Sequence, residues 1–570
     1  MKLILASLII APLLTACNPT STGTKASVND ASGTSSSDPV VPGTDPLVTE
    51  AWHILNTGQK TYSLTAGKTG EDMKINKVHE DDILGRGVRI AISDSGIDVN
   101  NPDLKANQLS SLHRDYTSNI QSNWRGGNPY PIEEEAHGTA VAGLVAAVGW
   151  NGIGSRGVAP SASYAGFLFI GDFHNNTASY LVKTLDQISG DFDIFNYSYG
   201  YQGCRFMDTS QSIIDAYKSG VTNLRNGKGA IYVKAAGNDY IGYNSECTSN
   251  DGTLYYGNTN TGEDQNLPYL ILVGALNASG QVSSYSTPGS GLWISAAGGE
   301  SGTGKPAMLT TDISGCQKGY ASKYSYPGFN RGNSVNPNCN YTSLMNGTSS
   351  AAPVLSGVVA LMLEANDSLT WRDVKHILAV TADRINFSLA PMIHPNYKDL
   401  AGHVYDYLYV KNAANYYFSN TYGFGRVNAQ AAVNMAKTYA IDLGTYVETN
   451  WEEDILSPAL NIPNQNATGL ERTIDLASTP NFIESVQIKI TTQHTYLGDL
   501  GLELTSAQGT VSKLLLINSN INDSGLIDYI FITNAFYGED SNGRWKLKVI
   551  DAGAKGTGTL SAWSIRINGH

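Results

Sequence analysis

The sequence has few basic residues and no dense cluster of them. Lysine and arginine together number 37 in 570 residues, against 50 aspartates and glutamates, which gives a formal net charge of −13 and an isoelectric point near 5.2. Nucleic-acid binding needs closely spaced basic side chains that release counterions from phosphates. This composition therefore argues against a nucleic-acid partner. The acidic surplus suits a soluble surface, cationic substrates or calcium instead.

The apolar run at the start of the chain is too short to span a bilayer stably. The chain begins MKLILASLIIAPLLTACNPT, with Lys2 ahead of the run and small residues after it, which is the pattern of a signal peptide. The segment Leu14–Cys17 resembles a bacterial lipobox, which implies cleavage before Cys17 and acylation of that cysteine. We expect residues 1–16 to be a lipoprotein signal peptide. The mature protein would be an exported lipoprotein, anchored in the outer membrane on its periplasmic or cell-surface face; a plain secretory signal is the alternative.

Cysteine is scarce, with five residues in the whole chain and no C-x-x-C spacing. The missing spacing argues against a redox dithiol or a cysteine-based zinc site. In a chain exported to an oxidising compartment, the four cysteines after Cys17 are expected to form two disulfides. Of the three possible connectivities we favour the sequential one, in which each bridge closes a modest loop and adds about 3 kcal/mol in the chain-entropy model. It pairs Cys204 with Cys247 and Cys316 with Cys339.

Bulky apolar residues are almost missing between Asn18 and Gly43, so we expect residues 17–43 to form a disordered tether. Beyond it, short β-rich runs such as GVRIAISDSGI and AIYVKAAGN alternate with helical patterns such as HGTAVAGLVAAV. This alternation predicts an α/β domain over residues 44–442. Its sheet would be doubly wound and mostly parallel, covered by helices on both faces, with functional groups at the carboxyl ends of the strands.

Helical patterns are nearly absent from Ile455 to the end of the chain. Segments such as FIESVQIKITT and RWKLKVID alternate apolar and polar residues between turn signals. The alternation predicts an all-β antiparallel sandwich over residues 466–570. The acidic stretch before it, over residues 443–465, is predicted to be a linker.

Three segments supply the side chains of a Ser/His/Asp hydrolase. A serine hydroxyl is a poor nucleophile until a base accepts its proton and a third group orients that base. ISDSGID ends an apolar strand at Asp94, EEEAHGTAVAGL places His137 at the start of a helix, and NGTSSAAPVL places Ser349 at the start of another. The order Asp, His, Ser along the chain is that of subtilisin. The neighbouring Ser350 is expected to matter only for its small size.

The motifs DSGID, HGTAVAG and GTSSAAP resemble the three signatures of subtilisin-like serine proteases. The resemblance implies a subtilisin-like fold, with the nucleophile, base and orienting acid as assigned above. VKAAGND resembles the family segment whose asparagine completes the oxyanion hole, which implies that role for Asn238. NYSYG resembles the family's S1-wall segment, along which substrate would lie as an added strand. The implied substrate contacts are Ser198, Tyr199 and Gly200.

The C-terminal segments HTYLGDLGLELTSAQGTVSKLLL and NGRWKLKVIDAGAKGTGTLSAWSIRING resemble the P domain of kexin- and furin-type proprotein convertases, a jelly-roll sandwich. In that family, carboxylates line the S1, S2 and S4 pockets and receive paired basic residues. This chain departs from the pattern, because Ser95 stands where convertases carry an S2 aspartate. Asp251 and Asp208 remain as S1 candidates and Asp172 as an S4 candidate. We expect a preference for arginine or lysine at P1 without strict dibasic recognition.

The segment VGWNGIGS resembles the family's calcium-binding loop, which offers the all-oxygen shell that Ca²⁺ prefers. The resemblance implies Ca²⁺ as a cofactor; a glycine-rich surface loop is the alternative. The implied ligands are Asp45, Asp103, Val148, Asn151, Ile153 and Ser155.

Only 27 residues separate Cys17 from Asp45, fewer than the several dozen of a usual subtilase prodomain. A resemblance to bacterial kexin-like proteases that use a separate chaperone implies such a folding partner here. The sequence thus predicts a lipid-anchored serine endopeptidase acting on proteins or peptides. A broad-specificity surface protease and a catalytically silent adhesion lipoprotein are the alternatives.

Overall fold

The computed structural model describes most of the chain from Asp45 to His570. The gaps in this description are residues 119–120, 132–134, 171–176, 201–203, 241–246, 248–254, 387–399, 401, 407, 478–479, 520–523 and 555. The predicted signal peptide and the tether, with Cys17, lie outside the described residues. Asp172 and Asp251 also lie outside them.

A seven-stranded parallel sheet forms the centre of the first domain, in the order β2-β3-β1-β4-β5-β6-β7. Its strands are β1 (Arg89–Asp94), β2 (Arg114–Asp115), β3 (Ser163–Leu168), β4 (Ile194–Tyr197), β5 (Ile231–Ala235), β6 (Leu270–Leu276) and β7 (Leu292–Ala297). The strand order reverses beside β1, so the carboxyl ends of β1 and β4 lie at a topological switch point, where open α/β sheets bind ligands. The predicted α/β class is confirmed.

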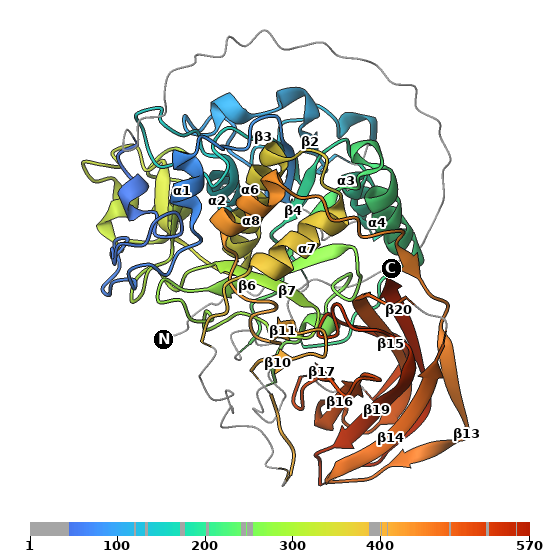
Figure 1. Ribbon diagram of the computed structural model, residues 1–570. Helices are drawn as coiled ribbons and strands as arrows, with labels where there is room; N and C mark the ends of the chain where they lie inside the picture. Colours follow the sequence, from blue (N-terminus) through green and yellow to red (C-terminus); the bar gives the residue numbers. More distant parts are fainter. Residues whose placement is uncertain are drawn as a thin grey trace.

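Helices cover both faces of this sheet (Figure 1). They are α1 (Ile75–Glu80), α2 (His137–Ala146), α3 (Thr177–Ile188), α4 (Gln211–Asn223), α6 (Thr348–Ala365), α7 (Trp371–Thr381) and α8 (Ala429–Lys437). Two neighbours in β4 identify the faces. Asn196 Oδ1 accepts a hydrogen bond from Ser356 of α6, whereas the Tyr197 ring packs edge-on against Tyr217 of α4. Side chains that alternate along a strand therefore meet helices on both sides.

Helix α6 runs through the interior of the domain. It is long and apolar enough to cross a membrane by length and composition, but 89% of it is buried inside the protein. It contacts β4, β5, β6 and β7 on one side and α2 and α8 on others. A helix that is apolar all round is suited to such a core position.

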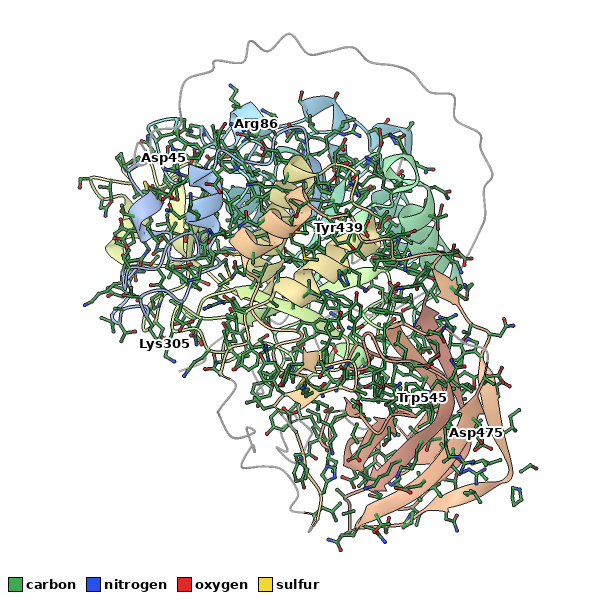
Figure 2. The ribbon with its side chains drawn as sticks, viewed as in Figure 1. Asp45, Arg86, Lys305, Tyr439, Asp475 and Trp545 are labelled. Atoms are coloured by element: carbon green, nitrogen blue, oxygen red, sulfur yellow. A yellow bond between two sulfur atoms is a disulfide. The ribbon has the colours of Figure 1, made fainter. Side chains whose placement is uncertain are left out.

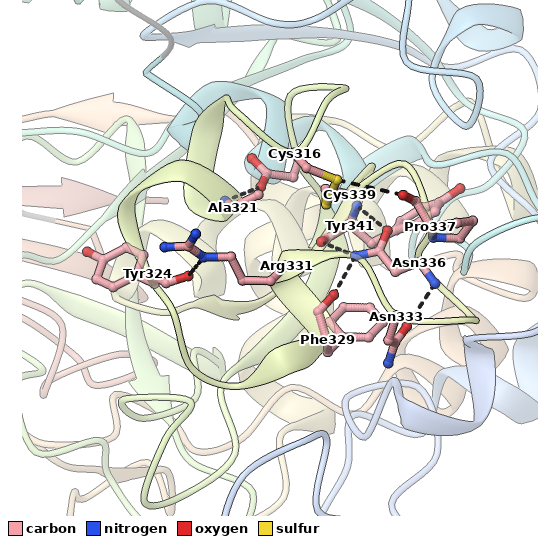
Figure 3. The surroundings of a disulfide bond; sticks show 11 residues. Cys316, Ala321, Tyr324, Phe329, Arg331, Asn333, Asn336, Pro337, Cys339 and Tyr341 are labelled. Atoms are coloured by element: carbon pink, nitrogen blue, oxygen red, sulfur yellow. Dashed lines mark hydrogen bonds between the residues drawn. A yellow bond between two sulfur atoms is a disulfide. The ribbon is translucent and has the colours of Figure 1, made fainter.

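A two-stranded unit, β8 (Met308–Thr311) with β9 (Tyr341–Met345), leads into α6, and the segment between these strands contains α5 (Gly319–Lys323). The Cys316–Cys339 disulfide closes this segment, with 5.0 Å between the Cα atoms. Figure 3 shows that Asn336 Nδ2 donates to the carbonyls of Phe329 and Tyr341 beside the bridge. The other disulfide joins Cys204 and Cys247, so the predicted sequential pairing is confirmed.

The second domain is a sandwich of two antiparallel sheets, with the orders β12-β20-β15-β18 and β14-β19-β16-β17, and β13 also pairs with β20. The strands are β12 (Val447–Glu448), β13 (Glu452–Ile462), β14 (Asn466–Leu476), β15 (Ile483–His494), β16 (Leu500–Thr505), β17 (Val511–Leu515), β18 (Gly525–Thr533), β19 (Gly543–Asp551) and β20 (Gly558–Gly569). In Figure 2 Trp545 lies within the sandwich and Asp475 on its outside. The predicted all-β sandwich is present.

The linker predicted over residues 443–465 needs correction. Strand β13 begins at Glu452 and pairs with β20, so the sandwich starts well before residue 466. Most side chains of β13 are exposed. An exposed strand rich in acidic residues has the composition of a linker, which is why the sequence alone misplaced this boundary.

A small hairpin of the first domain, β10 (Val410–Lys411) with β11 (Tyr417–Phe418), packs beside the sandwich (Figure 1). Within its turn, Asn412 Nδ2 donates to the carbonyls of Ala535 and Tyr537 in the second domain. The two domains therefore share backbone-directed hydrogen bonds as well as apolar contacts.

Candidate active site

The predicted acid and base meet at the carboxyl end of β1. Asp94 is the last residue of this strand and is fully buried, and His137 is the first residue of α2. Nδ1 of His137 lies 2.7 Å from Oδ1 of Asp94. Burial lowers the pKa of His137, but the charge and the hydrogen bond of Asp94 outweigh it, so the pKa is raised above its ordinary value. The carboxylate thus fixes the imidazole and favours its protonated form.

Ser349 lies in the first turn of α6 and is linked to the end of β4 by two hydrogen bonds. Its Oγ donates to the Ser198 carbonyl at 3.0 Å, and Ser198 Oγ donates to the Ser349 carbonyl at 2.9 Å. In this conformation the Ser349 hydroxyl is hydrogen-bonded to the wall strand and not to His137 among the described contacts. Such catalytic hydrogen bonds often align only when substrate is bound.

Asn238, just after β5, presents its amide beside the same helix start. Its Oδ1 accepts hydrogen bonds from the N–H of Thr348 at 2.9 Å and from Thr348 Oγ1 at 3.0 Å. Gly347 has φ of +106°, and a Cβ placed on it would lie 3.4 Å from Asn238 Nδ2 and 3.5 Å from Ser349 N. The side-chain amide and the backbone N–H therefore border one common space. Two such donors are what an oxyanion hole requires.

Ser198, Tyr199 and Gly200 continue directly from β4, as the predicted wall segment. A Cβ on Gly200 would lie 3.9 Å from both Lys234 Cε and Gln265 Nε2. Gln265 Nε2 also donates to the carbonyls of Ala235 and Ala236 at the end of β5, at 3.1 and 3.4 Å. Gln265 thus supports the end of β5 and lies close to Gly200 of the predicted wall segment.

A buried charge cluster behind this wall was not predicted. Lys234 Nζ lies 2.8 Å from Asp264 Oδ1, and Tyr217 donates to Asp264 Oδ2 at 2.8 Å. Burial, with the nearby charge of Asp264, raises the pKa of Glu263 to about 7. The signal in the sequence was Lys234 itself, because a lysine inside a buried strand requires an anionic partner.

The predicted acidic pocket residues are only partly placed. Asp208 is described and exposed, and partial desolvation of its carboxyl raises its pKa. No hydrogen bond is recorded between Asp208 and the wall segment in the part of the chain that the structure describes. Asp251 and Asp172 fall in the gaps.

The residues of the predicted calcium loop come together. The Asp45 carboxylate accepts from the N–H groups of Trp150 and Asn151, at 2.9 and 3.1 Å, and Asn151 Nδ2 donates to Asp103 Oδ1 at 2.7 Å. Val148 N donates to the Asp103 carbonyl at 2.8 Å. Ile153 and Ser155 follow in the same loop. The loop therefore wraps around two buried carboxylates that lie more than fifty residues apart in the sequence.

These residues fit a calcium ion in two respects. Asp103 Oδ2 is buried without a hydrogen bond of good geometry among the described residues. Burial and the charge of Asp45 raise the pKa of Asp103 to about 7, although the Asn151 amide, the Tyr341 hydroxyl and the Ser155 N–H oppose the shift. Asp45 already has a cationic partner in Arg156, so the charge left for a bound cation to neutralise is that of Asp103. Among the described residues no group of three or more His, Cys, Asp or Glu side chains is arranged to hold a metal ion, so amide and carbonyl oxygens would complete the shell. Arg156, which the sequence analysis missed, pairs with Asp45 at 2.9 Å.

Comparison with known proteins identifies the same two domains. The model of the subtilase family matches residues 85–425, and that of the proprotein convertase P-domain matches residues 483–567. The chain is 34% identical to the Aeromonas extracellular serine protease of Aeromonas sobria, over 94% of this chain and 93% of that protein. It is 30% identical to neuroendocrine convertase 2 of Homo sapiens, over 92% of this chain and 74% of that protein.

Solved structures support the same assignment of both domains. The crystal structure of the Aeromonas sobria serine protease covers 95% of this chain and 99% of its own, with a TM-score of 0.83 and 31% identity. A second structure of that protease, in complex with a chaperone, also has a TM-score of 0.83, at 31% identity over 94% of this chain and 97% of its own. The chain therefore belongs to the subtilase family of serine proteases, and its second domain is a proprotein convertase P domain.

Proposed function

We propose that this protein is a serine endopeptidase that hydrolyses peptide bonds through an acyl-enzyme formed on Ser349. The observation that supports this most directly is the 2.7 Å hydrogen bond between Asp94 and His137 at the switch point of the sheet. Helix α2, which begins at His137, packs against α6, which carries Ser349 in its first turn. A hydrogen-bonded acid and base beside a serine at a helix N-terminus are the parts that activate a hydroxyl nucleophile. The intact set also disfavours a catalytically silent adhesion protein.

In this mechanism Ser349 Oγ attacks the scissile carbonyl carbon while His137 accepts its proton. Asp94 holds the imidazole in the required tautomer and stabilises its cation. The carbonyl oxygen gains negative charge, and Asn238 Nδ2 and Ser349 N donate hydrogen bonds to it from the space beside Gly347. His137 then protonates the leaving amine, and a water molecule, deprotonated by the same histidine, releases the acyl group.

We propose a preference for arginine or lysine at P1, moderate in strength. Asp264 is already paired with Lys234, so the negative potential would come from Glu263 and Asp208. Burial raises the pKa values of both carboxyls, so they attract a cation only when ionised and the preference should weaken as the pH falls. The basic P1 residue is carried over from the resemblance to kexin- and furin-type convertases, with which this chain shares the P domain. Rates on peptides that differ only at P1 would separate this preference from a broad specificity.

We also propose that the loop around Asp103 binds Ca²⁺. The ligands would be the carboxylates of Asp45 and Asp103, the Asn151 side chain and carbonyls of the loop, including those of Val148, Ile153 and Ser155. The bound ion would supply positive charge between two buried carboxylates and so hold the loop in place.

A lipid anchor on Cys17 and a separate chaperone complete the proposal. The lipobox pattern supports export as a lipoprotein of the outer membrane. The chaperone complex of the Aeromonas sobria protease supports a folding partner for this chain. If co-expression with a chaperone did not change the yield of active enzyme, the chaperone proposal would be wrong.

Alanine substitutions of the adjacent residues Ser349 and Ser350 should have very different effects on activity. Ser349→Ala removes the attacking oxygen and should lower kcat for peptide hydrolysis by about 10⁵-fold or more. Ser350→Ala is the matched control, because Ser350 is buried in the same turn and its hydroxyl has no hydrogen-bond partner among the described residues. The control should keep activity and thermal stability near those of the parent. Equal activity of the two variants would contradict the assignment.

The pH dependence of kcat/KM should reflect the protonation of His137. The histidine acts as a base only when neutral, and Asp94 raises its pKa, so kcat/KM should fall as the pH drops through a value above about 6.5. Asp94→Asn removes the charge that raises the pKa. It should move this acid limb to lower pH and reduce kcat by about 10⁴-fold. An acid limb that does not move would show that another group controls it.

Calcium should raise thermal stability through Asp103. An ion that binds only the folded state adds about 2.7 kcal/mol at 100 times its Kd. We expect chelation to lower the Tm of the parent and to have little effect on Asp103→Asn. Asp312→Asn is the control, since Asp312 is a second buried carboxylate that accepts the N–H groups of Ile313, Tyr320 and Ala321 outside the loop. Loss of the calcium response in both variants would argue against a specific site.

Acylation should depend on Cys17. Cys17→Ser should abolish incorporation of labelled palmitate and release the enzyme from the membrane fraction, while the purified variant retains peptide hydrolysis. Palmitate labelling that persists in the variant would disprove the anchor.

A further inference from the structure

One loop of the catalytic domain bonds the end of β5, close to the proposed substrate wall, and also contacts the P domain. This loop, residues 258–266, connects the segment after Asn238 to β6 and includes the short helix η8 (Thr259–Thr261). We refer to it as the coupling loop. Its side chains divide into two sets by what they contact.

Asp264 and Gln265 form the set on the substrate side. Gln265 bonds the carbonyls at the end of β5 and approaches Gly200, and Asp264 pairs with Lys234 of β5. Both side chains are buried, with exposed fractions of 7% and 6%. The position of the wall therefore depends on where this part of the loop lies.

Asn260 and Asn266 form the set on the P-domain side. Asn260 Oδ1 accepts the N–H of Ile532 at 2.8 Å, and its Nδ2 lies 3.2 Å from the Ile532 carbonyl. Asn266 Nδ2 donates to the Ile530 carbonyl at 2.7 Å. Tyr529 adds a hydrogen bond from its hydroxyl to the Asn260 carbonyl at 2.6 Å.

These contacts follow from the position of β18 at the edge of its sheet. The strand pairs with β15 on one side only, so alternate residues direct N–H and C=O groups away from the sheet. Ile530 and Ile532 are two residues apart and belong to this outward set. The asparagine amides pair with these groups in the manner of a neighbouring strand, and Asn260 does so with both the donor and the acceptor of one residue.

We infer that the P domain determines the geometry of the substrate wall through the coupling loop, and that Asn260 and Asn266 are positioning residues for selectivity at P1. The inference rests on the proposed function, because it takes the segment from Ser198 to Gly200 as the wall of the S1 pocket. The edge of β18 fixes one side of the loop, and Gln265 and Asp264 transmit that position to β5 and Gly200. None of these side chains contacts the reacting atoms.

The test uses the full chain and two variants of different severity. Asn260→Ala removes the paired contact to Ile532, and Tyr529→Phe removes only one hydroxyl of the P domain, so it should fold even if Asn260→Ala does not. For each protein, kcat and KM are measured on peptides with arginine, lysine, leucine or alanine at P1, with active sites counted by a fluorophosphonate. Both variants should raise KM for the preferred peptide by about three- to tenfold and leave kcat nearly unchanged. The values of kcat/KM for peptides with different P1 residues should therefore become more alike.

Asn412→Ala is the matched control. Asn412 is also a buried asparagine of the catalytic domain whose amide donates to two backbone carbonyls of the P domain, but it lies in the β10–β11 turn and not in the coupling loop. It should lower Tm without changing the P1 ratios. If Tyr529→Phe keeps the parental KM and P1 ratios, or if Asn412→Ala changes them equally, the inference is wrong while the proposed function stands. A parent protein that does not hydrolyse any of the peptides would instead overturn the proposed function.

Discussion

Helix α6 is buried from Thr348 to Leu363, and the geometry of the site depends on that burial. Neighbours enclose the helix on all sides, so it has little room to shift or rotate. Its start is tied to β4 by the reciprocal hydrogen bonds between Ser349 and Ser198, and its next turns by Ser356 and Asn196. The position of Ser349, the proposed nucleophile, is therefore fixed by packing along the whole helix and not only by its immediate neighbours.

Buried ion pairs hold together segments that the chain separates widely. Asp45 meets Arg156 beside the proposed calcium loop, Lys234 meets Asp264 behind the proposed substrate wall, and Arg372 of α7 meets Glu484 of the P domain. Each charge loses water on folding, and its partner compensates for that loss only in one arrangement. Such pairs contribute modestly to net stability but penalise alternative packings, because a displaced partner leaves a buried charge alone. All three lie where a loop or a domain must be placed accurately.

The sequence predicted the parts whose signals are local. The alternation of strands and helices indicated the parallel sheet, and Asp94, His137 and Ser349 stood in motifs at element ends, where the structure has them. It misjudged β13, because the strand begins with three acidic residues, contains a proline and is exposed along most of its length, which is the composition of a linker. It also missed Asp264, although Lys234 signalled that an anion was needed. Which acid lies opposite a buried lysine depends on a fold that brings residues thirty positions apart into contact.

The interface between the domains follows from a general difficulty of sheets. An edge strand such as β18 presents unpaired N–H and C=O groups, and burying them without partners would be costly. Here a loop covers the edge with asparagine amides from Asn260 and Asn266, which supply donors and acceptors at the spacing of a strand. Because the same loop carries Gln265 to the end of β5, satisfying the sheet edge and supporting the substrate wall become one structural requirement. A P domain attached in this way forms part of the framework of the active site. Without it, the amides of Asn260 and Asn266 would lose their partners, and neither the coupling loop nor the proposed substrate wall beside it would be held in position.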